Sequence, residues 1–403
     1  MRRVVVTGMG AVSACGLGVD ALWQGAVNGK SGVRPVDFPD LPQQRVGTAA
    51  ALTAEDLEQL LAESGHRMRD PVASYAVHAA REAIAQSGLE SDDIDDRCGV
   101  VIGSGFGGAK TLDDNYLAFG KDGSMRLDPM SVPKIMNNAS ASWVSMEFGA
   151  KGPIYCPSTA CSSGSQGVGL AYQLIKGGAM ERCIAGGSEA CLVNGVFRVW
   201  ELLRVMTADK NRPFSKDRNG MILGEGAGVL VLETLESAEA RGATILCEIA
   251  GFGTNSDAGD LLRPDPERAT KCMQLALEDA GLQSSDIGYV NAHGTGTVAN
   301  DVTETGALRE VFGADLEGVE ISSTKPVHGH SLGAAGAIEL IVAAKALMEQ
   351  TAPPTINFNE IDPKIGLDPV ANTARAIDTG AVMSNSLAFG GVNASVILKR
   401  FDG

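Results

Sequence analysis

The chain has 403 residues, of which 44% are hydrophobic and 20% are charged, which is typical of a globular protein with a large core. Its formal net charge of −16 argues against nucleic acid or an anionic membrane as a general partner. No apolar run reaches the roughly 18 residues that a membrane span needs. The eight cysteines are scattered without a Cys-x-x-Cys pair, so we expect neither a disulfide nor a zinc framework, and a location in the reducing cytoplasm.

The N-terminus is the first predicted element. It reads MRRVVVTGMGAV, in which two arginines precede an apolar run, as in a signal peptide. The run is short, is broken by glycine and lacks a cleavage site. We therefore predict that it forms the first buried strand.

A unit that begins at Ala80 recurs later in the chain. AREAIAQSGLESDDIDDRCGVVIGSG predicts a helix, a Gly-Leu turn, an acidic linker and a strand that ends in a glycine-rich loop, and MQLALEDAGLQSSDIGYVNAHGTG from Met273 predicts the same order. The loop GSGFGG from Gly103 also matches the dinucleotide-binding pattern. It lacks the second strand with an acidic end that such a site requires about 20 residues later, so nucleotide binding is not expected.

The next special segment is PSTACSSGSQGVGLAYQLI, which contains Cys161. Its small residues allow close packing and predict a helix that begins deep in the interior. A thiol at a helix N-terminus is close to free N–H groups and to the positive end of the helix dipole, which favours the thiolate. A buried structural cysteine is the alternative. That alternative is our interpretation for the other cysteines in apolar segments, Cys15, Cys98, Cys183 and Cys247.

Two further correspondences support an internal duplication. The Cys161 segment resembles VHGHSLGAAGAIELIVAAKAL from Val327, and RCIAGGSEA resembles AVMSNSLAFGGVNAS. Strands alternate with helices, so the predicted class is α/β, with halves that meet near Gly242. Functional loops of such sheets gather at the carboxyl ends of the strands, so the special loops of both halves are expected to meet.

Two of the five histidines, His293 in VNAHGTGT and His330 in STKPVHGHSLGAAG, lie in loops of this kind. His66 and His78 are expected in an exposed linker and on a helix face. A cysteine with two histidines suits acyl transfer, in which a sulfur nucleophile acts with imidazoles that bind an enolate oxygen or move protons.

The chain resembles the elongating β-ketoacyl–acyl carrier protein synthases, which are thiolase-fold condensing enzymes of fatty-acid and type II polyketide synthesis. The resemblance covers almost the whole chain. It rests on the motifs VVVTGMGAVSACG, STACSSG, RPFSKDRNGMILGEGAG, NAHGTGT, KPVHGHSLGAAGAIE and MSNSLAFGGVNA. It implies an α/β, thiolase-like, internally duplicated fold of five αβαβα layers, with an N-terminal half at 1–242 that carries the cysteine and a C-terminal half at 243–403 that carries both histidines.

The resemblance also implies a reaction and its residues. An acyl chain would move from a carrier protein to Cys161, and malonyl-carrier protein would lose carbon dioxide to give an enolate that attacks the thioester. His293 and His330 match the catalytic histidines, and Lys325 matches the family's buried lysine. Phe389 matches the gate beside the cysteine, and its N–H and that of Cys161 would stabilise the thioester oxyanion.

Other implied positions concern substrate and partners. Thr295 and Thr297 match the pair that contacts the phosphopantetheine arm, which carries the substrates, so no separate cofactor is expected. Phe106 matches a residue that lines the acyl tunnel, and we expect its bulk to limit chain length. The acidic carrier protein would dock on a basic patch formed by Arg67, Arg69, Arg126 and Arg204. The chain would pair with itself or with a ketosynthase-like paralogue.

Some features stay open or depart from the family. Some relatives hold a monovalent cation at positions that match Asn291, Glu339, Ser384 and Asn385. Ser215 and Asn219 replace common aspartates, and Leu387 replaces a common phenylalanine. The alternatives are a partner subunit that sets chain length and a cysteine-dependent acyl hydrolase. The pathway, which could be fatty-acid, polyketide or lipo-oligosaccharide synthesis, is also open.

Overall fold

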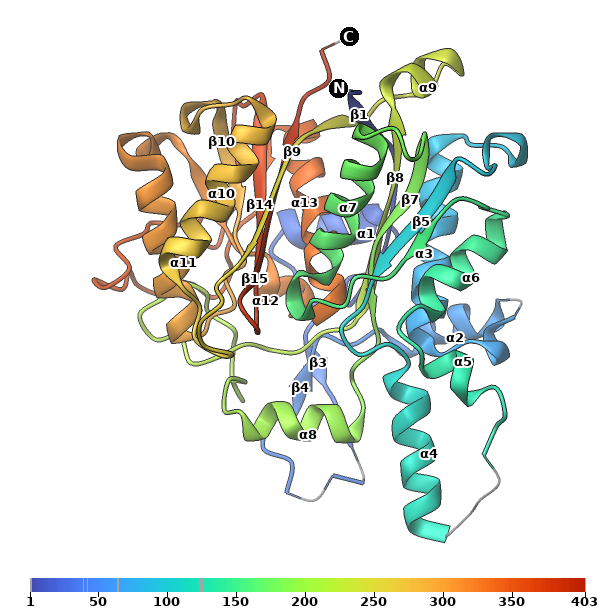
Figure 1. The fold of residues 1–403 in the computed structure, drawn as a ribbon. Helices are drawn as coiled ribbons and strands as arrows, with labels where there is room; N and C mark the ends of the chain where they lie inside the picture. The colour runs from blue at the N-terminus through green and yellow to red at the C-terminus, as the bar shows by residue number, and fades with distance from the viewer. Residues whose placement is uncertain (1, 39, 42, 64, 123–126, 403) are drawn as a thin grey trace.

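The structure, a computed structural model, describes residues 2–38, 40–41, 43–63, 65–122 and 127–402. Within these ranges, strands from both ends of the chain form one central mixed sheet (Figure 1). Its strands are β1 (Val4–Ser13), β2 (Gly16–Leu17), β5 (Cys98–Gly103), β6 (Ile154–Tyr155), β7 (Arg182–Glu189), β8 (Gly226–Thr234), β9 (Cys247–Ser256), β10 (Ile287–Asn291), β11 (Glu320–Ser322), β14 (Ala381–Ala388) and β15 (Val392–Lys399). All ten residues of β1 are buried, so the predicted first buried strand is confirmed.

The two halves of this sheet have the same topology. The strand order β6-β5-β7-β8-β1 of the first half matches the order β11-β10-β14-β15-β9 of the second. In each half the first three strands are parallel and the last two pair antiparallel. The halves join where Val4–Val6 of β1 pair with Cys247–Ile249 of β9. The topology confirms the predicted duplication, whereas the boundary between residues 242 and 243 remains a prediction.

Helices cover both faces of each half-sheet, which gives the five expected layers (Figure 1). The outer layers are α3 (Pro71–Ser87) with α6 (Ala139–Phe148), and α10 (Pro266–Ala280) with α11 (Val298–Phe312). The central layer consists of α7 (Ser163–Lys176) and α13 (Ala335–Glu349), most of whose residues are buried. None of the helices in the described ranges combines the length and the apolar character that crossing a membrane requires.

The remaining elements connect these layers or cover the carboxyl ends of the strands. The helices are α1 (Val19–Val27), α2 (Ala54–Ala62), α4 (Ala109–Asp122), α5 (Ser131–Ile135), α8 (Asn194–Leu202), α9 (Leu235–Ala240) and α12 (Lys325–His328). Two small hairpins are β3 (Arg34–Pro35) with β4 (Thr48–Ala49), and β12 (Thr351–Ala352) with β13 (Arg375–Ala376). Short 3₁₀ turns are η1 (His66–Met68), η2 (Ser91–Asp93), η3 (Ala160–Ser162), η4 (Ser284–Asp286), η5 (Gly313–Gly318) and η6 (Leu332–Ala334).

The repeat is also visible in how equivalent helices begin and end. The Asp70 carboxylate caps α3 just before a proline, and Asp265 caps α10 in the same way. Both helices end at a glycine in the left-handed region, Gly88 with φ +68° and Gly281 with φ +65°. A 3₁₀ turn with a reciprocal capping box then leads into the next strand in both halves. The predicted Gly-Leu turns therefore have one shared physical cause.

The two central helices approach each other closely at their N-terminal ends. A Cβ atom at Gly164 of α7 would lie 2.8 Å from the backbone nitrogen of Ala337, and one at Gly336 of α13 would lie 2.1 Å from Ser165 Oγ. Only glycine leaves this space free. The small residues around Cys161 thus do what the sequence predicted, since they let the helix begin inside the molecule and beside its equivalent.

Candidate active site

A cavity of about 310 Å³ lies at the carboxyl ends of the strands and is lined by both halves of the chain. It brings together six of the residues predicted from the sequence: Cys161, His293, Thr295, Thr297, His330 and Phe389. Of the other two, Lys325 lies directly behind His293, whereas Phe106 is not among the lining residues. The loops of the two halves therefore meet as the duplication predicted.

Cys161 lies in the turn η3 immediately before α7 and is 6% exposed. The preceding residue, Ala160, has a φ of +50°, a strained conformation for a residue other than glycine. Burial raises the pKa of the Cys161 thiol to about 11, while Lys325 and the N–H of Phe389 act in the opposite direction. The expected resting thiolate is therefore not favoured in the closed cavity, because desolvation outweighs the groups that stabilise the anion.

His293 is held so that one ring nitrogen remains free to donate. Lys325 Nζ lies 3.4 Å from His293 Nδ1. Because an ammonium group only donates hydrogen bonds, Nδ1 must accept, and this assigns the proton of a neutral ring to Nε2. Burial, and then Lys325 and His330, lower the pKa of His293 well below its usual value. The ring is thus a neutral imidazole that can donate from Nε2.

Lys325 itself is almost fully buried and forms an ion pair with Glu339 of α13. Burial raises the pKa of Glu339 above its usual value, and the Lys325 ammonium lowers it. The predicted buried lysine is therefore found beside one histidine and one carboxylate, rather than at the surface.

His330 is positioned by its backbone. Its N–H donates to Ile222 O at 2.8 Å, and its carbonyl accepts from Gly224 N at 3.0 Å. Its ring lies edge-on to that of His293, with centroids 5.4 Å apart. Burial and Lys325 lower the pKa of His330 well below its usual value, and its Nδ1 has no hydrogen-bond partner within the described residues. Both histidines are therefore neutral imidazoles.

Two buried carboxylates hold the loop that carries His293. Glu304 accepts hydrogen bonds from the N–H groups of His293 at 2.7 Å and Gly294 at 2.8 Å. Asp301 accepts from Gly296 N at 3.1 Å. Both carboxylates belong to α11, the helix that follows the loop. This loop also presents Thr295 and Thr297, whose hydroxyls are 2.9 Å apart.

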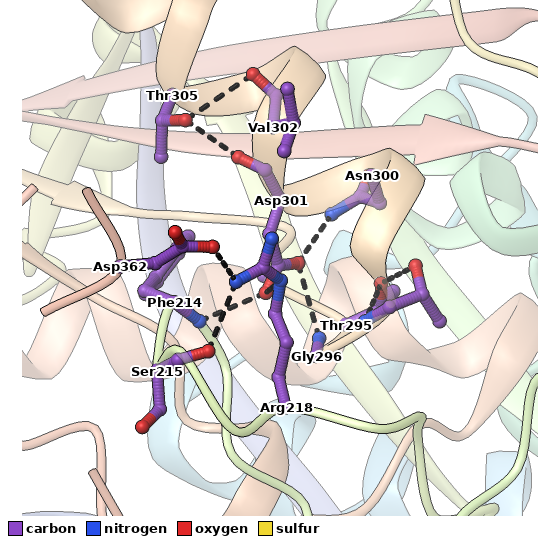
Figure 2. Close-up of polar contacts among 12 residues, drawn as sticks. Phe214, Ser215, Arg218, Thr295, Gly296, Asn300, Asp301, Val302, Thr305 and Asp362 are labelled. Carbon is purple, nitrogen blue, oxygen red and sulfur yellow. Dashed lines mark hydrogen bonds and ion pairs between the residues drawn. The ribbon is translucent and has the colours of Figure 1, made fainter. Parts of the chain in front are cut away.

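Figure 2 shows that the same network ties this loop to the RPFSKDRNG segment. Asp301 accepts from Phe214 N at 2.9 Å and lies 3.7 Å from Arg218 Nε. Arg218 donates to Asp362 at 2.6 Å and to the carbonyl of Ser215 at 3.0 Å. The RPFSKDRNG segment thus stabilises the His293 loop through its contacts with Asp301.

A third buried carboxylate, Glu189 at the end of β7, links the two halves beside Cys161. It accepts from Gly105 N at 2.8 Å, Phe106 N at 3.2 Å, Gly333 N at 3.1 Å and Ser104 Oγ at 3.3 Å. Burial raises the pKa of Glu189 to about 7, and these hydrogen bonds oppose the shift. The sequence prediction missed this residue, although a glutamate at the end of an apolar strand was a usable signal.

Other lining residues were also missed. Trp200 on α8 and the loop from Asp260 to Pro264 form part of the cavity wall, and Asn219 and Leu387 line it as well. No local pattern indicated Trp200, because its role depends on contacts with a distant segment.

The predicted basic patch is only partly supported. Arg67 and Arg204 are exposed, and Arg204 lines the cavity. Arg126 lies outside the described residues. Arg69 was a wrong prediction for an exposed patch, because its guanidinium is buried, pairs with Glu147 at 3.0 Å and lies over the ring of Trp143.

The suggested cation positions contain buried oxygen atoms without a hydrogen-bond partner in the described part of the chain. These are Asn291 Oδ1, Glu339 Oε2 and Ser384 Oγ. Asn291 and Ser384 are register partners on β10 and β14. Three oxygen atoms that can act as ligands, one of them from a carboxylate, fit a monovalent cation. Asn385 fits less well, because its Oδ1 already accepts from Ser395.

Comparisons with known proteins agree with this geometry. Family models described as "Beta-ketoacyl synthase, N-terminal domain" and "Beta-ketoacyl synthase, C-terminal domain" match residues 1–238 and 246–359. The chain is 41% identical to nodulation protein E of Rhizobium sp. (strain N33), with 99% of both chains covered. It is 38% identical to 3-oxoacyl-[acyl-carrier-protein] synthase 2 of Staphylococcus aureus (strain N315), over 100% of this chain and 99% of the relative.

Among solved structures, the ishigamide ketosynthase/chain length factor superposes with a TM-score of 0.94 at 34% identity, with 99% of each chain covered. Its likeness extends over both halves of the sheet. The chain therefore belongs to the β-ketoacyl synthase family and has its thiolase-like fold.

Proposed function

We propose that the chain is an acyltransferase that catalyses the decarboxylating Claisen condensation of malonyl-acyl carrier protein with an acyl chain held on Cys161, giving β-ketoacyl-acyl carrier protein. The observation that carries this proposal is the single cavity that unites Cys161 of one half with His293 and His330 of the other. Family membership over nearly the whole chain supports it.

The first step is acyl transfer to the cysteine. The sulfur attacks the carrier-bound thioester as its proton passes to a neutral imidazole, and the imidazolium returns that proton to the carrier sulfur as it leaves. The N–H groups of Cys161 and Phe389 both lower the pKa of the thiol, which supports our assignment of these groups to the oxyanion of the tetrahedral intermediate. The high pKa of the thiol makes the proton acceptor necessary, because little thiolate exists at rest.

The second step forms the new carbon–carbon bond. His293 Nε2–H, together with His330, donates to the carbonyl oxygen of the malonyl thioester. The bond to the carboxylate breaks, carbon dioxide leaves, and the electron pair forms an enolate. The enolate carbon attacks the acyl group on Cys161, and the sulfur leaves as a thiolate that takes up a proton from water. Lys325 holds the His293 tautomer that this donation requires.

Substrate delivery uses the mouth of the same cavity. Thr295 and Thr297 line it and offer hydroxyl groups to the amides of a phosphopantetheine arm. With Arg69 buried, Arg67 and Arg204 are the exposed arginines on which we propose that the carrier protein docks, in an otherwise acidic chain. Reversing both charges should raise the KM for acyl-carrier protein, and the effect should shrink with added salt. An unchanged KM at low salt would remove the patch from the proposal.

The chain also has an apolar edge suited to pairing. Strand β6 lies at the end of the sheet, and its Ile154 and Tyr155 are 41% and 45% exposed. An exposed sheet edge is a common site of association. We propose that a second ketosynthase-like chain, either a copy or a paralogue, covers it. One similar solved structure is described as a ketosynthase/chain length factor, which supports a two-chain assembly.

Mass spectrometry of carrier-bound products tests the proposal. Cys161→Ala should fold normally but fail to form acyl-enzyme and β-ketoacyl product. His→Ala at 293 or 330 should slow malonyl decarboxylation more than acylation of Cys161. Acyl-enzyme on the Cys161→Ala variant would refute the nucleophile. Release of free acid in place of condensed product would indicate a hydrolase, and absence of all turnover would favour a partner subunit.

A further inference from the structure

We propose that Trp200 is a positioning residue that holds Phe389 in place, and thereby holds the Phe389 N–H in line with the sulfur of Cys161. The inference rests on the proposed function, because it concerns the oxyanion site of acyl transfer. Trp200 contacts the gate residue Phe389, and we expect its effect to be transmitted through that contact.

The two rings form a stacked pair. Their centroids are 5.6 Å apart and their planes differ by 15°. Trp200 lies on α8 and is 7% exposed, so the pair has one firmly buried member. Both residues line the cavity that contains Cys161. The pair is thus a contact between a helix of the first half and the β14–β15 turn of the second.

The turn that contains Phe389 joins Ala388 of β14 to its register partner Val392 of β15. Gly390 and Gly391 follow it with φ angles of +84° and +69°, in the region that glycine adopts freely. Gly390 N donates to Leu261 O at 2.8 Å, and Gly391 N donates to Ala388 O at 3.0 Å. These bonds fix the glycine side of the turn. We infer that the stack with Trp200 restrains the Phe389 ring and, through it, the orientation of the Phe389 peptide.

The orientation matters because the Phe389 N–H acts on the Cys161 thiol and lowers its pKa. If the Phe389 N–H changes its orientation, it binds the developing oxyanion less well, because such donors act through preorganisation. Offset aromatic pairs favour the stacked state by about 2- to 12-fold. Removal of the aromatic face at Trp200 should therefore lower the aligned population by a factor in this range.

The test compares Trp200→Leu, which removes the aromatic face, with Trp200→Phe, which keeps one. Trp143→Phe is the control, because Trp143 contacts Arg69 rather than the cavity turn. Two rates are measured: acylation of Cys161 by saturating acyl-carrier protein, and alkylation of Cys161 by iodoacetamide as a function of pH. We expect Trp200→Leu to slow acylation about 2- to 12-fold and to move the alkylation profile to higher pH, while Trp200→Phe and Trp143→Phe stay close to the natural chain.

A double-mutant cycle with Phe389→Leu separates positioning from a general structural effect. If Trp200 acts through the Phe389 ring, Trp200→Leu should have little further effect in the Phe389→Leu background. Additive effects, or an unchanged alkylation profile in Trp200→Leu, would overturn the proposal. If Trp200→Leu does not fold, Trp200→Met enters the same cycle. The alkylation arm needs no carrier protein, so a natural chain that alkylates normally but does not condense would refute the proposed function alone.

Discussion

Replacement of Lys325 by methionine should make the stability of this protein abnormally sensitive to alkaline pH. The substitution keeps a long side chain but removes the ammonium that pairs with Glu339 in the interior. Burial raises the pKa of Glu339, and Lys325 is the group that lowers it. Without the lysine, the folded state must either protonate this carboxyl or hold an uncompensated charge.

The sign and size follow from proton linkage. A carboxyl whose folded pKa lies above its unfolded value of 4.5 contributes stability that is complete below that pH and is lost as the pH rises toward the folded value. Between the unfolded and the folded pKa, each pH unit lowers the free energy of unfolding by about 1.4 kcal/mol. Lys325→Met should raise the folded pKa of Glu339 further, so the pH range over which stability is lost extends to higher pH. The free energy of unfolding of this variant should therefore continue to fall above pH 7, toward a total loss of about 3–5 kcal/mol.

Urea unfolding at pH 7, 8 and 9 measures this directly. Lys345→Met is a matched control, because Lys345 pairs with Glu349 on the same helix but with both side chains partly exposed. That control should change stability by less than about 1 kcal/mol at every pH. A difference between Lys325→Met and the natural chain that stays constant from pH 7 to 9 would refute the reasoning, because it would mean that Glu339 does not titrate in response to the lysine.

Three further outcomes are expected. Glu304→Gln leaves one buried N–H of the His293 loop without an acceptor, so it should lower the free energy of urea unfolding by about 1–3 kcal/mol and slow condensation. Equal stability would show that the loop keeps its conformation without this carboxylate. Gly333→Ala places a Cβ 2.4 Å from Gly105 N, so the free energy of unfolding from differential scanning calorimetry should fall by about 1–3 kcal/mol. An unchanged melting temperature would mean that the backbone shifts to relieve this contact at no cost. Phe106→Gly, assayed with primers of graded length, should raise kcat/KM for long primers and leave short ones nearly unchanged; identical length profiles would place the limit elsewhere.

Much of the fold was predictable because its signals are local and occur twice. The glycines that end α3 and α10 adopt the same left-handed conformation, and each follows a helix with an Asp-Pro start. Such signals fix the order of elements in each half, and equal order in two halves gives equal topology. The meeting of Cys161 with His293 then follows from the position of loops at the strand ends.

What the sequence did not reveal depends on contacts between distant segments. Arg69 resembles any exposed arginine in its own segment, and only the fold brings Glu147 and Trp143 against it. Trp200 lies in an ordinary amphipathic helix, and its stack with Phe389 joins positions far apart in the chain. Neither contact has a periodic pattern, so no window of local sequence contains the information.

The duplicated turns have a consequence for how the work is divided between the halves. Leu332 repeats the positive φ of Ala160, with +45° against +50°, so Gly333 occupies the place that Cys161 has in the first half. The strain therefore belongs to the scaffold and not to the chemistry. At the second turn, the backbone of Gly105 and the Glu189 carboxylate fill the space that a side chain would need. One copy of the turn carries the Cys161 thiol, whereas the other has no room for a side chain, so a symmetric framework carries its reactive group in one half only.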